Sequence, residues 1–531
     1  MTFPGTPREN LSPAAWQRVR RHALPSWMLE RATERRLQGD WRGACAAARV
    51  RVTFDDHEAR RSLGREGANR LYEDLEHFAP DLVRWHFPRQ ASTLLGHQID
   101  LRLARYSEIR GLYVSGPYSV EPEFLTLSLR PRFNHDSRAW PFDEAGWAWD
   151  VRRVHAFRAH CGGGSRLPFF HKDGTPLSRA EIAQEDPEDD VAELTERLTV
   201  LAEHGREAVA WSAVGVTART AVRRALMFGR AVERARVLAA RRGTDMIGLT
   251  RGNHGAVCLD VARPQAPCLV TVQSASACES LPFLSPLWWS MPADLQLLRR
   301  GLITPADLHP LVRTAVFPAL TQPPPDENDA RDRGSESVRV YCAGRWHEVT
   351  VGPAGPVTPH PEGHEPSVEE YVHGRRPPGG CQVVVKAWRT GRGRLPAKLR
   401  ELRRNLLLKV RHGDTPAVTA LLDTGLDPRV RCWQGGSLLH ELRHLDHDQL
   451  LHRLLAAGLD VNQPDSQGDS PLHVAVRGYG TPELVRALIA AGADPHQENQ
   501  SGKTPAQLAR WHRRDLPALV PSRLGPTDAA T

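Results

Sequence analysis

The 531-residue sequence contains no long apolar run, and no stretch approaches the roughly 18 residues that a membrane-spanning helix needs. Its first residues, MTFPGTPREN, lack a basic segment followed by an apolar one, so we expect no secretory signal. These absences predict a cytoplasmic protein without a membrane partner. Hydrophobic residues at 40% and charged residues at 25% also exclude a mostly disordered chain.

Lysine is scarce, because only five of the 70 basic residues are Lys and the others are Arg. Together with 42 Gly and 42 Pro, this bias is typical of GC-rich codon usage. The net charge of +8 would permit an anionic partner. Since part of that charge reflects codon usage, it is weak evidence for one.

Closely spaced cysteines and known catalytic motifs are absent as well. The eight cysteines form no C-x-x-C pair and are spread over almost 400 residues, which predicts free and mostly buried thiols. There is no P-loop, no strand-linked G-x-G-x-x-G and no G-x-S-x-G elbow. We therefore expect no cofactor, no metal and no catalytic residue, although an unfamiliar active site within residues 13–320 stays open.

Hydrophobic periodicity predicts a multidomain chain. Leu71, Leu75 and Leu82 lie at helical spacing, whereas Ile99, Leu101 and Leu103 alternate as in a strand. The segment Val338 to Val351 predicts a hairpin with Ala343-Gly344 at its turn, and Val383-Val384-Val385 predicts a third strand. The expected parts are an α+β N-terminal domain (13–320, with a helical start, a short antiparallel meander and further helices), a linker (321–337), a small β module (338–390), a basic connector helix (391–404), helical repeats (405–515) and a disordered tail (516–531).

The last part of the chain contains an internal repeat. The sequence LLDTGLD around Gly425 returns as LLAAGLD around Gly458 and as LIAAGAD around Gly492, so the motif recurs with an almost constant period. In each unit, Ser or Thr followed by Pro would start a helix, with the hydroxyl as N-cap and Pro at the first position. Gly would end a second helix in left-handed geometry. One unit cannot bury its apolar face alone, so neighbouring units are expected to stack.

This segment resembles the ankyrin-repeat family, most clearly over Gly468 to Pro495 and more loosely from Asn405 to Arg514. The outer units depart from the family pattern and are interpreted as caps. The resemblance implies an α-helical ankyrin-repeat solenoid that binds an unidentified protein partner through its hairpin tips and inner helices. The residues that it places on this face are Trp433, Gln434, Glu441, Ser466, Gln467, Asp469, Val474, Arg477, Asn499 and Lys503.

The whole chain also resembles a group of ankyrin-containing proteins from high-GC bacteria whose activity is not known. The resemblance rests on the segments Gly39 to Val50 and Asp307 to Pro318. It implies no activity for residues 13–320.

Two clusters of His suggest chemistry that we weigh against a structural role. His440-Glu441-Leu442-Arg443-His444 matches the zinc motif H-E-x-x-H, but His440 also occupies a repeat position where its ring would hydrogen-bond within the repeat. The second cluster, His155, His160, Cys161 and His171, could hold a metal or a nucleophile, although no family motif fits it. We favour the structural interpretation of both.

The segment from Lys386 to Arg411 carries the most concentrated positive charge, opposed only by Glu401. It could neutralise the phosphates of nucleic acid or of another polyanion. Alternatively, it is a solvated face or docks on acidic residues. Polyanion binding is therefore an alternative to protein binding.

Overall fold

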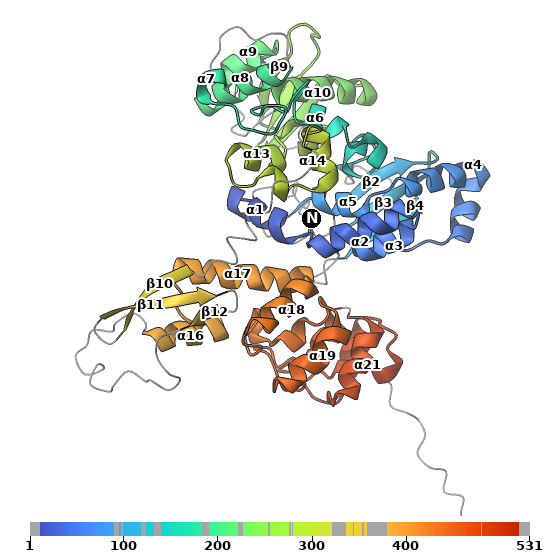
Figure 1. The fold of residues 1–531 in the computed structure, drawn as a ribbon. Helices are drawn as coiled ribbons and strands as arrows, with labels where there is room; N and C mark the ends of the chain where they lie inside the picture. The colour runs from blue at the N-terminus through green and yellow to red at the C-terminus, as the bar shows by residue number, and fades with distance from the viewer. Residues whose placement is uncertain are drawn as a thin grey trace, which may run out of the picture. The chain divides into compact units, whose positions relative to one another are not determined.

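The fold is described from a computed structural model of the chain (Figure 1). The described residues are 11–89, 95–96, 99–117, 124–131, 140–182, 191–220, 227–252, 255–274, 278, 280–320, 336–342, 345–352, 355–357, 380–478 and 480–519. The chain divides into two compact units: Met1–Arg20, Ala32–Ser115 and Leu125–Pro325 form unit 1, and Arg21–Arg31, Gly116–Phe124 and Asp326–Thr531 form unit 2. Most of the predicted linker and of the predicted C-terminal tail lies outside the described residues.

The chain begins with helices, as predicted. The amphipathic pattern from Arg70 to Trp85 is divided between two helices, because Pro80 starts the second and cannot continue the hydrogen bonding of the first. The helices are α1 (Pro13–His22), α2 (Ser26–Leu37), α3 (Trp41–Ala47), α4 (Asp56–Glu76) and α5 (Pro80–His86).

A five-stranded sheet follows in the order β1-β4-β3-β2-β5. Its centre is the predicted antiparallel meander of β2 (Asp100–Arg105), β3 (Arg110–Ser115) and β4 (Leu125–Pro131). Two parallel edge strands, β1 (Val50–Val52) and β5 (Trp140–Pro141), were not predicted. The small residues of the segment Trp41 to Val50 predict a helix that extends to Val50, but Val50 instead pairs with Leu125, which is distant in the sequence.

The rest of unit 1 combines short helices with a second sheet in the order β6-β9-β8-β7. The sequence from Thr217 to Arg242 predicts one helix, but helix α10 starts only at Phe228, and Thr217 itself lies in a strand. The strands are β6 (Thr217–Ala218), β7 (Met246–Gly252), β8 (Gly255–Asp260) and β9 (Cys268–Val272). The helices are η2 (Gly146–Ala148), η3 (Val151–Arg153), α6 (Ala156–His160), α7 (Arg179–Ile182), α8 (Val191–Glu203), α9 (Glu207–Ala213), α10 (Phe228–Arg242), α12 (Pro286–Trp289), α13 (Ala293–Arg299), η4 (Pro305–Asp307) and α14 (Pro310–Val316).

Unit 2 contains the predicted hairpin, formed by β10 (Glu336–Cys342) and β11 (Arg345–Gly352), with β12 (Gly355–Val357) as a third strand. The hairpin's turn residues lie outside the described part of the chain. The strand predicted at Val383–Val385 is wrong, because these residues lie within helix α16 (Cys381–Thr390). Cys381, Val384 and Trp388 are buried at intervals of three and four, so helical burial overrides the β preference of three successive valines.

The remainder of unit 2 is helical and shares one apolar core with the small sheet. In Figure 1 the sheet lies beside α16 and α17, and the later helices continue from α18. These elements are α17 (Ala397–His412), α18 (Thr415–Asp423), η6 (Trp433–Gly435), η7 (Leu438–Glu441), α19 (His447–Ala456), α20 (Pro471–Arg477), α21 (Pro482–Ala490), α22 (Pro505–Trp511) and η8 (Pro517–Leu519).

All eight cysteines are free and six of them are buried, as predicted. Across the ranges described above, none of the helices has both the length and the apolar character needed to cross a bilayer.

Candidate functional site

Three repeats begin with a matching capping arrangement. Ser470 caps α20 by accepting a hydrogen bond from the His473 amide, while the His473 ring accepts one from the Ser470 amide at 3.2 Å. Ser437 and His440 form such a box at η7, and Thr504 and Gln507 form one at α22. Each box satisfies amide groups that the first turn of a helix otherwise leaves unpaired. The predicted hydroxyl caps are therefore confirmed for these helix starts.

The two histidines also connect successive repeats. Nε2 of His440 lies 3.1 Å from the main-chain oxygen of Asp469, which belongs to the next hairpin loop. Nε2 of His473 lies 3.0 Å from the main-chain oxygen of Lys503, one repeat further on. Since the other ring nitrogen of each His accepts from its own cap, Nε2 carries the proton in both. Each neutral imidazole thus joins one repeat to the next.

The loops that precede these helices are hydrogen-bonded to one another. The amide of Ser466 donates to the carbonyl of Gln434 at 2.8 Å, and the amide of Gln500 donates to the carbonyl of Gln467 at 3.1 Å. Each loop is closed internally as well; for example, the amide of Asp465 donates to the carbonyl of Asp469 at 2.9 Å. The loop tips are therefore held at fixed positions along one edge of the repeats.

Glycine is required where the outer helices end. Gly425, Gly458 and Gly492 have φ values of 98°, 82° and 94°, a region that residues with a Cβ rarely adopt. The predicted left-handed positions are confirmed. They return the chain to the next loop after α18, α19 and α21.

The predicted binding residues differ in exposure. Gln434, Ser466, Gln467 and Lys503 are exposed, and Trp433, Arg477 and Asn499 are partly buried. The resemblance also places Glu441 and Val474 at exposed positions of the inner helices, and this prediction is wrong because each is only 5% exposed. Asp469, which was expected at the edge of a loop tip, is fully buried.

Asp469 is buried because two side chains enclose its carboxylate. Arg477 forms an ion pair with it at 2.8 Å, and the Asn499 side-chain amide donates to it at 2.7 Å. This carboxylate therefore positions Arg477 and the next loop.

The repeat pattern predicts Asn499 and Gln500 as the tip of the third loop, but in the structure this loop is shifted by one position. Asn499 closes that loop by donating to the Lys503 carbonyl at 3.0 Å, as Asp465 does with Asp469 in the loop before. The tip residues are consequently Gln500 and Ser501, both exposed, and not Asn499 and Gln500. The period of the repeat is longer at this last step, so counting back from the Thr504-Pro505 cap would have revealed the shift.

The same shift reveals a residue that the sequence analysis missed. Counting from the capping boxes, Trp511 corresponds to Arg477 and to His444 in the two preceding repeats. Its side chain is 79% exposed at the end of α22. Exposed Trp is enriched among residues that dominate binding energy at protein interfaces, so Trp511 joins the candidate face.

Trp433 is partly buried and packs against the core of unit 2. The Arg411 guanidinium, from the end of α17, lies 5.0 Å from the centre of its ring. Trp433 therefore packs against the preceding helix while keeping part of its surface accessible to a partner.

The H-E-x-x-H string does not have the geometry of a zinc helix. His440 uses both ring nitrogens in hydrogen bonds, and residues Leu438–Glu441 form a short 3₁₀ turn. His444 is buried 3.7 Å from the Glu441 carboxylate. Among the described residues, no group of three or more His, Cys, Asp or Glu side chains could hold a metal ion.

The second His cluster does not come together either. His155 is exposed, and His171 pairs with Glu181 at 3.2 Å. His160 is buried, stacked on Trp147 with ring centres 4.3 Å apart, and its Nδ1 accepts a hydrogen bond from Arg230 at 2.8 Å. Burial lowers the pKa of His160 and raises the pKa of the Cys161 thiol, so both stay neutral. Neither is prepared as a nucleophile or a base.

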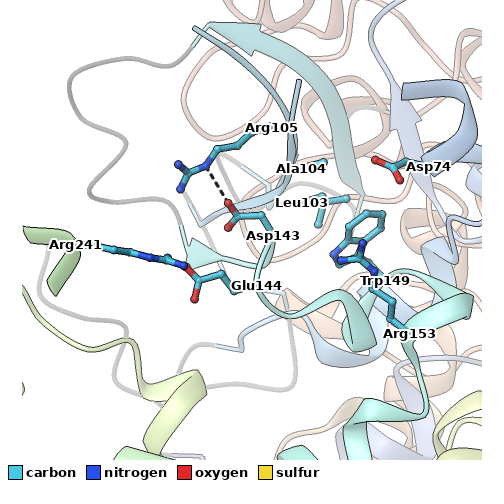
Figure 2. A pocket seen from close by; sticks show the side chains of 9 residues that line it. All are labelled: Asp74, Leu103, Ala104, Arg105, Asp143, Glu144, Trp149, Arg153 and Arg241. Atoms are coloured by element: carbon cyan, nitrogen blue, oxygen red, sulfur yellow. Dashed lines mark hydrogen bonds and ion pairs between the residues drawn. The ribbon is translucent and has the colours of Figure 1, made fainter. Parts of the chain in front are cut away.

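Unit 1 has a cavity of about 370 Å³ beside β2, lined by charged residues and Trp149 (Figure 2). Its charged side chains form ion pairs, some with one another and some with neighbouring residues outside the lining. Arg105 lies 2.9 Å from Asp143, as the dashed line in Figure 2 marks, and Arg241 reaches the carboxylate of Glu144. Asp74, on the other side, pairs with Arg152 at 2.9 Å. Ion pairs of this kind hold the walls of the cavity in place.

The basic segment 386–411 is only partly neutralised. Arg389 forms an ion pair with Asp427 at 2.7 Å, and Arg403 donates to the carbonyls of Trp388 and Arg431. Other cations of the segment are exposed and form no ion pair with an acidic side chain in the described part of the chain, namely Lys386, Arg392, Arg394 and Arg404.

Comparison with known proteins bears on the C-terminal repeats alone. No curated protein matches the chain. Residues 454–509, about a tenth of the chain, match the family model for ankyrin repeats (many copies). The match covers the helices α20 and α21 together with the hairpin loops that present Ser466, Gln467 and Gln500.

Proposed function

We propose that the C-terminal repeats bind another protein and that the chain acts in the cytoplasm through this interaction. Ankyrin repeats generally mediate protein–protein interaction, and residues 454–509 match that family. We extend the repeats to residues 405–515 and propose that they stack as a solenoid. We otherwise keep the predicted domain boundaries. We propose that residues 391–412, which contain helix α17, serve both as the connector and as the source of the first helix of the repeats.

One observation carries the proposal, namely the backbone hydrogen bonds between neighbouring loop tips. Because the Ser466 amide donates to Gln434 and the Gln500 amide donates to Gln467, the tips cannot move independently. Side chains on a rigid edge lose little conformational entropy when a partner binds. The exposed Gln434, Ser466 and Gln467 therefore make a prepared surface at the tips.

The experiment compares two sets of substitutions in the full-length chain. In the first, Gln434, Ser466, Gln467 and Lys503 are changed to Ala; in the second, exposed residues of the outer helices, Gln449, His452 and Arg486, are changed to Ala. A tagged chain is used to recover partners from a lysate of the source organism. We expect the first set to lose the partner and the second to keep it. Equal recovery by both sets would refute the proposal.

A second candidate is polyanion binding through residues 386–411. The specific support is the set of exposed cations without acidic partners described above. Counterion release predicts that affinity for a DNA duplex falls steeply with salt, and that changing Arg392, Arg394 and Arg404 to Gln flattens the slope. A slope that is the same in the variant would exclude this function. An enzyme within residues 13–320 has no comparable observation in its favour.

A further inference from the structure

The inner face of the repeats holds a cluster of guanidinium groups that the sequence analysis did not predict. Arg411, His444 and Arg477 occupy equivalent positions of successive repeats, and Arg443 lies beside His444. They come from α17, from the turn after η7 and from α20. The recurrence places one basic group in each of three successive repeats.

Arg443 reaches from its own repeat to the next one. Its side chain lies directly over Cα of Gly478, at the end of α20, where there is no room for a Cβ atom. The pKa of Arg443 is lowered, first by burial and then by repulsion from Arg411 and Arg477, against the attraction of Glu441. The guanidinium groups of Arg411, Arg443 and Arg477 therefore repel one another across the inner face.

Two of these guanidinium groups have no counter-ion among the residues that the structure describes. Arg477 is paired with Asp469 at 2.8 Å. Within the described ranges, by contrast, the side chains of Arg411 and Arg443 form no hydrogen bond and no ion pair, and the Nε of each is buried without an acceptor. Burial of an unpaired N–H group is unfavourable, and binding an acceptor would relieve that cost. Both residues are only partly buried, so their terminal amino groups can be reached.

The nearby carboxylate does not meet this need. Burial raises the pKa of Glu441, so its ionised form is disfavoured even beside Arg443 and Arg411. The face therefore keeps an excess of positive charge that an incoming carboxylate would offset. Guanidinium groups bind carboxylates in a forked geometry that lysine cannot reproduce.

We propose that the partner of this face presents an acidic, extended peptide segment, whose carboxylates bind Arg411 and Arg443. This inference rests on the proposed protein-binding function. The neutral amide side chains of Gln434 and Gln467 at the adjoining tips can donate to and accept from a peptide backbone. The face has few cations and two buried carboxylates, whereas nucleic acid is bound by many phosphate contacts, so a peptide fits better than a polynucleotide.

The test uses the full-length protein and fluorescence anisotropy. The probes are a fluorescein-labelled peptide rich in Asp and Glu, a matched peptide with Asn and Gln, and a single-stranded oligonucleotide of similar charge. We expect only the acidic peptide to bind well, and we expect R411Q and R443Q each to lower the affinity for this peptide roughly tenfold. R486Q removes an Arg that pairs with Glu483 on α21 and should leave the affinity unchanged.

Three results would overturn the inference: equal binding of the neutral peptide, equal loss with R486Q, or an oligonucleotide that binds more tightly than the acidic peptide and depends on Arg411 and Arg443. If R443Q fails to fold, R443K keeps the charge and loses the fork. R443K should then weaken binding of the acidic peptide, and unchanged affinity for that peptide in both R443K and R411Q would refute the inference. If no acidic peptide binds while the tip substitutions still abolish partner recovery, the inference of an acidic partner segment is wrong and the proposed protein-binding function stands.

Discussion

Nε2 of His440 donates a hydrogen bond to the main-chain oxygen of Asp469, 3.1 Å away and 29 residues later in the chain. Its Nδ1 accepts from the Ser437 amide at 3.0 Å, so one neutral ring caps its own helix and holds the next loop. His473 repeats the relationship with Ser470 and Lys503. In this protein, successive repeats are therefore connected through buried imidazoles as well as through a shared apolar core.

His473→Ala should destabilise the repeats by about 2 kcal/mol, since it removes a capping interaction and a hydrogen bond to the next loop. Hydrogen–deuterium exchange across residues 468–512 measures the change. His473→Gln should have a smaller effect, because Gln507 forms the corresponding capping box at α22. Exposed His452 offers the control His452→Ala, and a similar loss of protection in that variant would contradict the assignment.

The contribution of His440 to the stability of the repeats should decrease as the pH falls below 6.5. Burial lowers the pKa of His440 from 6.5, so the folded protein binds fewer protons than the unfolded chain just below that value. The contribution of His440 to the free energy of unfolding therefore rises with pH in this range and decreases on acidification. Exchange measured between about pH 7 and about pH 5 should show this loss in wild type and less of it in His440→Gln. Identical pH profiles would exclude His440 as its source.

Glu441→Gln should remove a pH dependence of opposite sign. The pKa of this buried carboxyl is raised from 4.5, so the folded state retains a proton that the unfolded chain loses. Stability therefore falls as the pH rises above 4.5. The neutral amide cannot titrate, and the variant should lack that decrease in exchange measurements on α20. A variant that keeps it would place the titrating group elsewhere.

In unit 1, Asp294→Asn should be strongly destabilising. The carboxylate of Asp294 is buried and accepts from Arg20 and from the Trp85 indole, the latter at 3.0 Å. Removing its charge leaves the Arg20 guanidinium buried without a counter-ion, which costs about 3 kcal/mol or more. Faster exchange in α5 and α13 would report the loss, and exposed Asp245→Asn is the matched control. Unchanged protection in Asp294→Asn would show that the pair contributes little.

Local rules were sufficient wherever a feature depends on its immediate neighbours. Ser470-Pro471 and Thr504-Pro505 start helices because hydroxyl caps and proline satisfy or avoid unpaired amides within one turn. Gly458 was recognisable as a left-handed position for an equally local reason. The meander was predictable because its strands pair with the next in sequence.

Features that depend on residues distant in the sequence could not be predicted from local sequence rules. Val383–Val385 have the composition of a strand, yet their helix is set by burial against β10 and β12. The parallel pairing of Val50 with Leu125 has no local signal. From its position in the sequence, Asp469 lies at the edge of a loop tip, where exposure to solvent is expected. Only the fold shows that Arg477 and Asn499 enclose its carboxylate. Trp511, which is exposed, was not identified as a face residue because the last step of the repeat is longer than the step before it.

The most direct test of the protein-binding face is site-specific photo-cross-linking in the full-length chain. A photoreactive amino acid is placed at the exposed loop tip residue Gln467 and, in a second variant, at exposed Arg486 on the outer helix α21. The account predicts a discrete cross-linked partner from position 467 and none from position 486. Cross-linking from position 486 alone, or from neither position, would contradict it.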